Sequence, residues 1–155
     1  MILNTPDGMD IDSPTVDDID KILLQEDDYW NQGSGAASLS KNDNQPELMF
    51  FRKSNYGYIV LELDSYKALI TNKKDKNMMV VHHIGGEPFP VPSCFFISRE
   101  QAREILLHYL DTGEMLNYEL WQDIYDDFDG DAYYESEEYY SGTEVFDKNH
   151  LHKKL

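Results

Sequence analysis

The middle of the chain is a series of short apolar runs whose connections are too short for parallel strands. The runs are rich in aromatic and β-branched residues and are separated by turn-forming residues or a short basic stretch. They cover 48–51, 58–63, 67–70 and 78–84. Parallel neighbours would need crossovers of about a dozen residues or more. The pattern predicts an antiparallel meander of about five strands, in which the proline-rich start of an extended piece at 89–97 suits a sheet edge.

Two amphipathic helices are predicted on either side of this β-rich region. Ser13 has the character of an N-cap before a proline, and apolar residues at helical spacing carry the first helix from about 14 to 25. A capping box at Ser98 begins a second helix near residues 99–112, and Gly113 ends it in a left-handed conformation. One antiparallel sheet packed by two helices is an α+β fold.

The remaining segments divide the chain into one domain and an extension. Residues 31–46 are polar and rich in glycine, which predicts a flexible loop. A chain of 155 residues with 41% hydrophobic content can bury one adequate core. We therefore predict a single α+β domain at 1–123, and an acidic, tyrosine-rich extension at 124–155 that packs on the domain or trails from it.

Charge is distributed unevenly along the chain. Fourteen of its 30 Asp and Glu residues lie in 104–147, which holds no Lys or Arg, and nine more lie in 1–30. Nine of the 13 Lys and Arg residues lie in 41–103. A net charge of −17 repels nucleic acid and anionic membranes and attracts basic clefts. We expect a protein partner with a basic cleft, and no direct contact with nucleic acid or membrane.

Targeting and membrane signals are not evident in the sequence. The chain starts without a basic region followed by a long apolar one, and no apolar run approaches the roughly twenty residues of a membrane helix. The lone Cys94 excludes an internal disulfide framework and fits a reducing compartment. We therefore expect a cytoplasmic protein, and the sequence leaves its oligomeric state open.

Catalytic and metal-binding interpretations fit the sequence less well than binding does. Cys94 and either His82 or His83 could form a thiol–imidazole pair, but Cys94 lies in an apolar run before a helix, where buried cysteines are common. A calcium loop centred on Gly130 would lack the required carboxylates at both ends. We expect no catalytic residue, no cofactor and no metal site; an enzyme built on Cys94 or the histidines is a third hypothesis.

The segment from Asp126 to Tyr140 combines carboxylates with aromatic rings. A merely solvated acidic segment has few aromatic residues, whereas rings at binding surfaces supply contact area at low entropic cost. The combination predicts a surface that occupies a cleft built to hold bases and phosphates. The predicted contact residues are Asp126, Asp127, Asp129, Asp131, Tyr133, Tyr134, Glu135, Glu137, Glu138, Tyr139 and Tyr140.

From about Ser13 to Gln122 the chain resembles the immunity protein one family of bacterial polymorphic toxin systems. These are small cytosolic antidotes encoded beside contact-dependent or type VI-delivered toxins. The resemblance rests on the opening helix, on a Gly-Gly-Glu-Pro turn, on a helix that ends in Thr-Gly-Glu and on a downstream tryptophan. The motif residues are Gly85, Gly86, Thr112, Gly113 and Trp121. The family usually has glutamate after its tryptophan, where this chain has Gln122.

The resemblance implies an immunity protein that binds a cognate toxin domain, a nuclease or nucleic-acid deaminase, and blocks its basic substrate cleft without doing chemistry. The helix stop at Thr112 and Gly113 and the tryptophan at 121 also suit purely structural roles. The extension after Asp123 lies outside the family pattern, so its role is inferred from charge and aromatic content alone. The alternative is a broad nucleic-acid mimic that inhibits many basic nucleic-acid-binding proteins.

Overall fold

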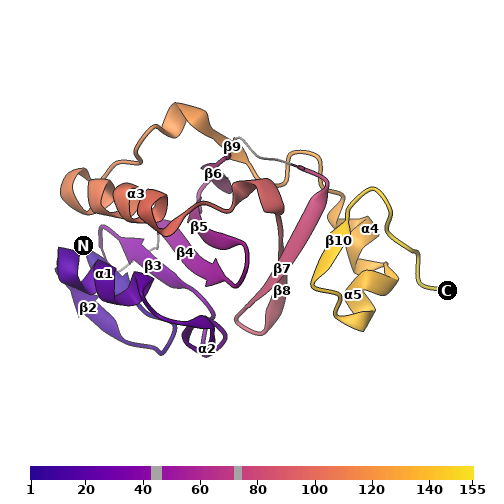
Figure 1. Ribbon diagram of the computed structural model, residues 1–155, viewed down its shortest axis with the longest axis horizontal. Coiled ribbons are helices and arrows are strands. Elements are labelled where there is room, and N and C mark those ends of the chain that lie inside the picture. Colours follow the sequence, from indigo (N-terminus) through magenta and orange to yellow (C-terminus); the bar gives the residue numbers. More distant parts are fainter. Residues whose placement is uncertain (43–46, 72–74) are drawn as a thin grey trace.

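Within residues 1–42, 47–71 and 75–155, which the computed structural model describes, the strands form a seven-stranded and a three-stranded antiparallel sheet (Figure 1). The larger sheet has the order β2-β1-β3-β4-β5-β6-β9 and the smaller has the order β10-β7-β8. The strands are β1 (Ile2–Asn4), β2 (Asp10–Asp12), β3 (Ala37–Ser40), β4 (Leu48–Lys53), β5 (Gly57–Glu62), β6 (Lys67–Leu69), β7 (Met78–Ile84), β8 (Glu87–Pro92), β9 (Trp121–Asp123) and β10 (Val145–Asp147). The helices are α1 (Val16–Leu23), α2 (Asp27–Trp30), α3 (Arg99–Thr112), α4 (Gly130–Tyr134) and α5 (Glu137–Ser141), with short 3-10 turns η1 (Ser93–Phe95) and η2 (Tyr118–Leu120).

The predicted α+β fold and its antiparallel meander are confirmed, and the sheet is larger than predicted. Strands β3 to β6 are successive antiparallel neighbours. The meander stops at β6 because β9 takes the other side of that strand. Strand β7 therefore pairs with β8 and β10 in the smaller sheet, where the proline-rich β8 is an edge strand as predicted. The basic stretch predicted to connect β6 and β7, residues 71–77, lies partly outside the described residues.

The first helix starts later than its sequence suggested. The N-cap of α1 is Thr15, whose hydroxyl accepts the backbone N–H of Asp18, while the Asp18 carboxylate accepts the backbone N–H of Thr15. Ser13 instead adopts a left-handed conformation (φ 51°) ahead of the buried Pro14. Thr15 is the N-cap because the residue three positions after it has a carboxylate, which completes a reciprocal capping box.

The second helix, α3, has the predicted boundaries. Ser98 and Gln101 cap its start reciprocally, and Gly113 ends it at φ 75°. It packs against α1 and β5. Its buried face consists of Ala102, Ile105, Leu106 and Tyr109.

The predicted flexible loop at 31–46 is wrong for its middle part. Residues Ala37–Ser40 form β3, a largely buried strand between β1 and β4, while residues 43–46 lie outside the described residues. A Cβ atom on Gly33 would lie 1.8 Å from the Pro6 carbonyl oxygen, and one on Gly35 would lie 2.2 Å from that of His83. These glycines therefore allow close backbone approach and do not indicate flexibility.

The central strands β4 and β5 of the larger sheet are buried on both faces. Neighbouring residues of a strand point to opposite faces. Phe50 of β4 packs toward Trp30 of α2, whereas Phe51 stacks on His82 of β7 and meets Phe89 of β8 edge-on. The β7–β8 hairpin thus covers the face of β4 opposite α2, and the main core lies between these layers.

The acidic extension is folded onto the domain. It carries α4, α5 and β10, and β10 pairs with β7 at the end of the molecule opposite β2 (Figure 1). None of the helices in the described part of the chain combines the length and the apolar character needed to cross a membrane.

Candidate partner-binding surface

A small hydrophobic cluster holds the extension against the outer face of β7. Met79 and Val81 of β7 point away from the main core and are covered by Tyr133 of α4 and Phe146 of β10. The rings of Tyr133 and Phe146 are stacked, with centroids 5.0 Å apart. Side chains two residues apart on a strand share one face, so β7 contributes Val80 to the main core and its neighbours to this second cluster. The extension is therefore an ordered part of the fold.

Two of the seven predicted contact carboxylates have structural roles. Asp129 is the N-cap of α4 and accepts the backbone N–H of Ala132 (3.1 Å). Glu138 accepts the backbone N–H of His152 (2.6 Å), and its side chain is mostly buried. Both groups are committed to hydrogen bonds within the extension, so they shape the surface more than they offer charge to a partner.

The other five predicted carboxylates form the exposed acidic surface of the extension. All are exposed, and none forms an ion pair with any residue that the structure describes. They are Asp126, Asp127, Asp131, Glu135 and Glu137. Unpaired carboxylates on one small unit produce a concentrated negative potential that draws in basic surfaces. We call these five residues the acidic face.

The four predicted tyrosine anchors separate into buried and exposed rings. Tyr133 is only 1% exposed, so it is a core residue of the extension and was wrongly predicted as a contact. Burial raises the pKa of its phenol to about 12. Tyr139 is half-buried and packs edge-on against Tyr133 and Tyr134. Tyr134 and Tyr140 are 50% and 60% exposed, so these two rings are accessible beside the acidic face.

Basic residues near the end of the chain lie against this surface. The backbone N–H of Glu137 donates to the carbonyl of His152 (2.7 Å), and that of Lys154 donates to the carbonyl of Glu135 (3.0 Å). The ammonium of Lys154 lies 4.0 Å from the centroid of the Tyr140 ring. The Tyr140 ring therefore already contacts a cation of this chain, which is the kind of contact that a basic partner would make.

The residues that carry the family resemblance occupy structural positions. Gly85 and Gly86 form the two-residue turn between β7 and β8, and both have positive φ, as a type I′ turn requires. The Thr112 hydroxyl donates to the carbonyl of His108, and Gly113 ends α3. Trp121 is buried in the main core, and its indole N–H donates to the carbonyl of Leu116 (3.1 Å).

The cysteine and histidines that could form a catalytic pair differ in their exposure to solvent. Cys94 and His82 are both buried, whereas His83 is exposed. Nε2 of His82 lies 2.7 Å from the carbonyl oxygen of Gly35 and must donate to it, because a carbonyl only accepts. Among the described residues, no group of three or more His, Cys, Asp or Glu side chains is placed to share a metal ion.

The buried His82 predicts a pH-dependent stability. Burial lowers the pKa of its imidazole below the ordinary value of 6.5, an effect that the hydrogen bond to Gly35 opposes. Lys53 and His83 also lower the pKa, and Glu144 raises it. Below pH 6.5, His82 binds a proton in the unfolded chain but stays neutral in the folded chain until the pH reaches its lowered pKa. The contribution of neutral His82 to the free energy of unfolding is therefore complete above pH 6.5 and is lost on acidification.

We expect His82→Gln to flatten this dependence. The glutamine amide can still donate to Gly35, but it does not titrate. Between pH 7 and the lowered pKa of the folded state, the wild type should lose up to about 1.4 kcal/mol of unfolding free energy per pH unit more than the variant. Urea unfolding of both proteins across this range measures the difference, and parallel curves would contradict a neutral buried His82.

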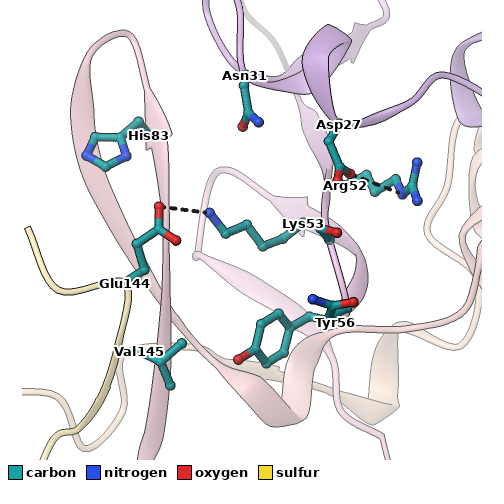
Figure 2. Close-up of a pocket in the computed structure, with 10 residues that line it drawn as sticks. Asp27, Asn31, Arg52, Lys53, Tyr56, His83, Glu144 and Val145 are labelled. Carbon is teal, nitrogen blue, oxygen red and sulfur yellow. Dashed lines mark ion pairs between the residues drawn. The ribbon is translucent and has the colours of Figure 1, made fainter.

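An open cleft that the sequence did not indicate separates the extension from the larger sheet. Its volume is about 650 Å³, and it is lined by residues of α2, β4, the β4–β5 turn, β7 and the start of β10. Figure 2 shows Lys53 and Glu144 pointing toward each other across it, with Nζ and Oε1 3.6 Å apart. No sequence signal could have located this cleft, because its lining comes from four separate parts of the chain.

Comparison of this chain with protein families, curated proteins and solved structures finds no match. The geometry and charge of the surface itself are therefore what indicate a function.

Proposed function

We propose that the protein is an immunity protein that binds a cognate bacterial toxin domain and occludes its basic substrate cleft. The observation that supports this most is the acidic face, five exposed carboxylates without ion pairs among the described residues, presented next to exposed Tyr134 and Tyr140. A cleft that holds bases and phosphates is lined by cations and stacking surfaces. Carboxylates and tyrosine rings are chemically complementary to both.

The folded platform under the acidic face strengthens the proposal. Because Tyr133 and Phe146 anchor α4 and α5 on β7, the surface is ordered before a partner arrives. A pre-ordered surface loses less conformational entropy on binding than a disordered acidic tail does. The acidic field would also speed the encounter with a basic domain. The resemblance to the immunity protein one family supports the same function, and binding by occlusion requires no catalytic group on this chain.

Local neutralisation of the acidic face tests the proposal. We expect the triple variant Asp131→Asn, Glu135→Gln, Glu137→Gln to bind the cognate toxin domain at least about tenfold more weakly, because each carboxylate faces a cation of the cleft. The logarithm of affinity should also depend less steeply on salt. The partner is first identified by co-purification with the product of the neighbouring reading frame, and affinity is then measured by calorimetry at several salt concentrations.

A matched control separates local contact from overall charge. The triple variant Asp10→Asn, Asp12→Asn, Asp111→Asn removes the same charge from exposed positions of β2 and α3. It should bind within about twofold of the wild type, since distant exposed charges are largely screened. Equal losses in both triples, together with binding to unrelated basic proteins, would instead indicate a broad nucleic-acid mimic. Full affinity in the first triple would rule out the acidic face as the contact surface.

A further inference from the structure

The three arginines of this acidic chain lie along adjoining cavities, and no residue of the acidic face is among the described residues that line them. Arg52 lines both the open cleft described above and a second cavity of about 350 Å³, and Arg99 lines that second cavity and a third of about 320 Å³. Arg103 lines the third. The cavities share lining residues, so they follow one another from the extension past the β4–β5 turn to α1 and α3.

The charged residues that line the second cavity are mostly basic, whereas the chain as a whole is acidic. Among the described residues that line it, the charged ones are Arg52, Lys53 and Arg99 against the carboxylate of Glu26. In the whole chain, 30 acidic residues face 13 Lys and Arg. We call this space, between the end of α1, the β4–β5 turn and the start of α3, the arginine cavity.

The neighbouring cations have partners that Arg99 lacks. Arg103 holds Asp20 with two nitrogens, at 2.6 and 3.3 Å, and Lys53 pairs with Glu144. Arg52 donates to the carbonyl of Gln25 (3.1 Å) and forms ion pairs with Glu26 (3.4 Å) and Asp27 (3.8 Å). No ion pair of Arg99 occurs within the described ranges of the chain. Arg99 also lies in the first turn of the 14-residue α3, where the helix dipole adds positive potential.

Exposed apolar side chains border the arginine cavity. Leu24 and Tyr56 both line it and are 59% and 38% exposed. Arginine and tyrosine are enriched at the energetic centres of protein interfaces, and arginine is the side chain best shaped to hold a carboxylate with two hydrogen bonds. The composition fits a docking site for an acidic side chain that has apolar neighbours.

We infer that the arginine cavity is a second contact site, which receives an aspartate or glutamate from an extended loop of the protein partner. Nucleic acid does not fit, because a polyanion would meet the repulsion of the surrounding acidic surface. A single carboxylate between apolar side chains would avoid that repulsion and contact Leu24 and Tyr56. The inference rests on the proposed function only in so far as the partner is a toxin domain.

The first test asks whether removal of the positive charge of Arg99 weakens or strengthens binding to the partner. Removing a positive charge from this protein should strengthen binding to a basic partner if only overall electrostatics act. We expect Arg99→Gln to do the opposite and weaken binding about tenfold, because a desolvated partner carboxylate would lose its ligand. Lys21→Gln, an equal charge change at an exposed position of α1 outside the cavity, should stay within about twofold. Unchanged or tighter binding by Arg99→Gln would overturn the inference.

A second test uses the chain alone and does not depend on a partner. The three arginines give three Nε–Hε signals in an NMR spectrum, so each can be followed separately. Glutarate, which resembles a glutamate side chain, should shift the Arg99 and Arg52 signals saturably, while its uncharged counterpart glutaramide should not. In Arg99→Gln the shift at Arg52 should weaken at least about fivefold.

The outcomes of the two tests are distinguishable. Inorganic phosphate that binds more tightly than glutarate would identify a phosphate site and overturn the carboxylate inference, as would the absence of any saturable shift. If the unmodified chain forms no complex with the neighbouring gene product, the proposed function fails, and the glutarate titration by itself decides the inference.

Discussion

The Gly35→Ala variant is expected to lose about 3 kcal/mol or more of unfolding free energy. A Cβ atom at this position would lie 2.2 Å from the carbonyl oxygen of His83, and the residue has φ 80°, which L side chains rarely adopt. The obstructing atom belongs to the backbone of β7. This strand pairs with β8 on one side and β10 on the other, so it cannot move away without loss of backbone hydrogen bonds. The same shift would disturb the hydrogen bond from His82 to the Gly35 carbonyl.

Gly85→Ala is the matched control for this prediction. Gly85 also has positive φ, at 59°, but a Cβ atom there would meet no atom within 4 Å. Its cost should therefore be the conformational strain alone, about 1 kcal/mol. Urea unfolding of both variants measures the difference. Similar losses in the two proteins would show that the contact between the 31–36 segment and β7 is looser than the structure has it.

Tyr133→Ala is expected to unfold the acidic extension while the rest of the domain stays folded. The substitution removes the central ring of the cluster that joins the extension to β7, and truncation of a fully buried aromatic costs about 3–5 kcal/mol. The cluster is separate from the main core, so the loss should be confined to α4, α5 and β10. Hydrogen exchange should show lost protection in β10, with α3 unchanged.

Tyr134→Ala provides the adjacent control, because Tyr134 is half exposed. It should leave the unfolding free energy within about 1 kcal/mol of the wild type. If the proposed function is right, it should weaken toxin binding through loss of an exposed ring, whereas Tyr133→Ala should weaken binding through disorder of the whole acidic face. Full protection of β10 in Tyr133→Ala would show that the ladder to β7 holds the extension without the cluster.

Local signals in the sequence predicted much of the fold. Reciprocal capping at Ser98 and the glycine at 113 set the limits of α3, because these interactions involve residues only three or four positions apart. The β4–β5 and β7–β8 hairpins follow for the same reason, since short turns impose antiparallel neighbours. The strand pairs β1–β2 and β1–β3 were not predicted, because strands of three or four residues are stabilised mainly by their partners and are too short to show a clear pattern in the sequence.

The candidate surface was predicted in part. The acidic face lies within the segment that charge and aromatic content indicated, and contact with a toxin stays a prediction for these residues. Burial of Tyr133 could not be read from its own neighbourhood, because Tyr133, Tyr134, Tyr139 and Tyr140 have equally acidic surroundings. The signal lay elsewhere: the run from Met78 to His82 has no polar alternation, which is typical of a strand covered on both faces.

The charge of this protein, its α+β class and the ends of α3 follow from the order of its residues, because composition, periodicity and capping act between near neighbours in the chain. The accessibility of individual carboxylates and tyrosines, and the meeting of the arginines, result from tertiary packing. Arg52 and Arg99 are 47 positions apart and share a cavity only because α3 packs on the sheet beside the β4–β5 turn. Burial of single side chains and contact between distant residues depend on long-range packing, which a local sequence pattern does not indicate.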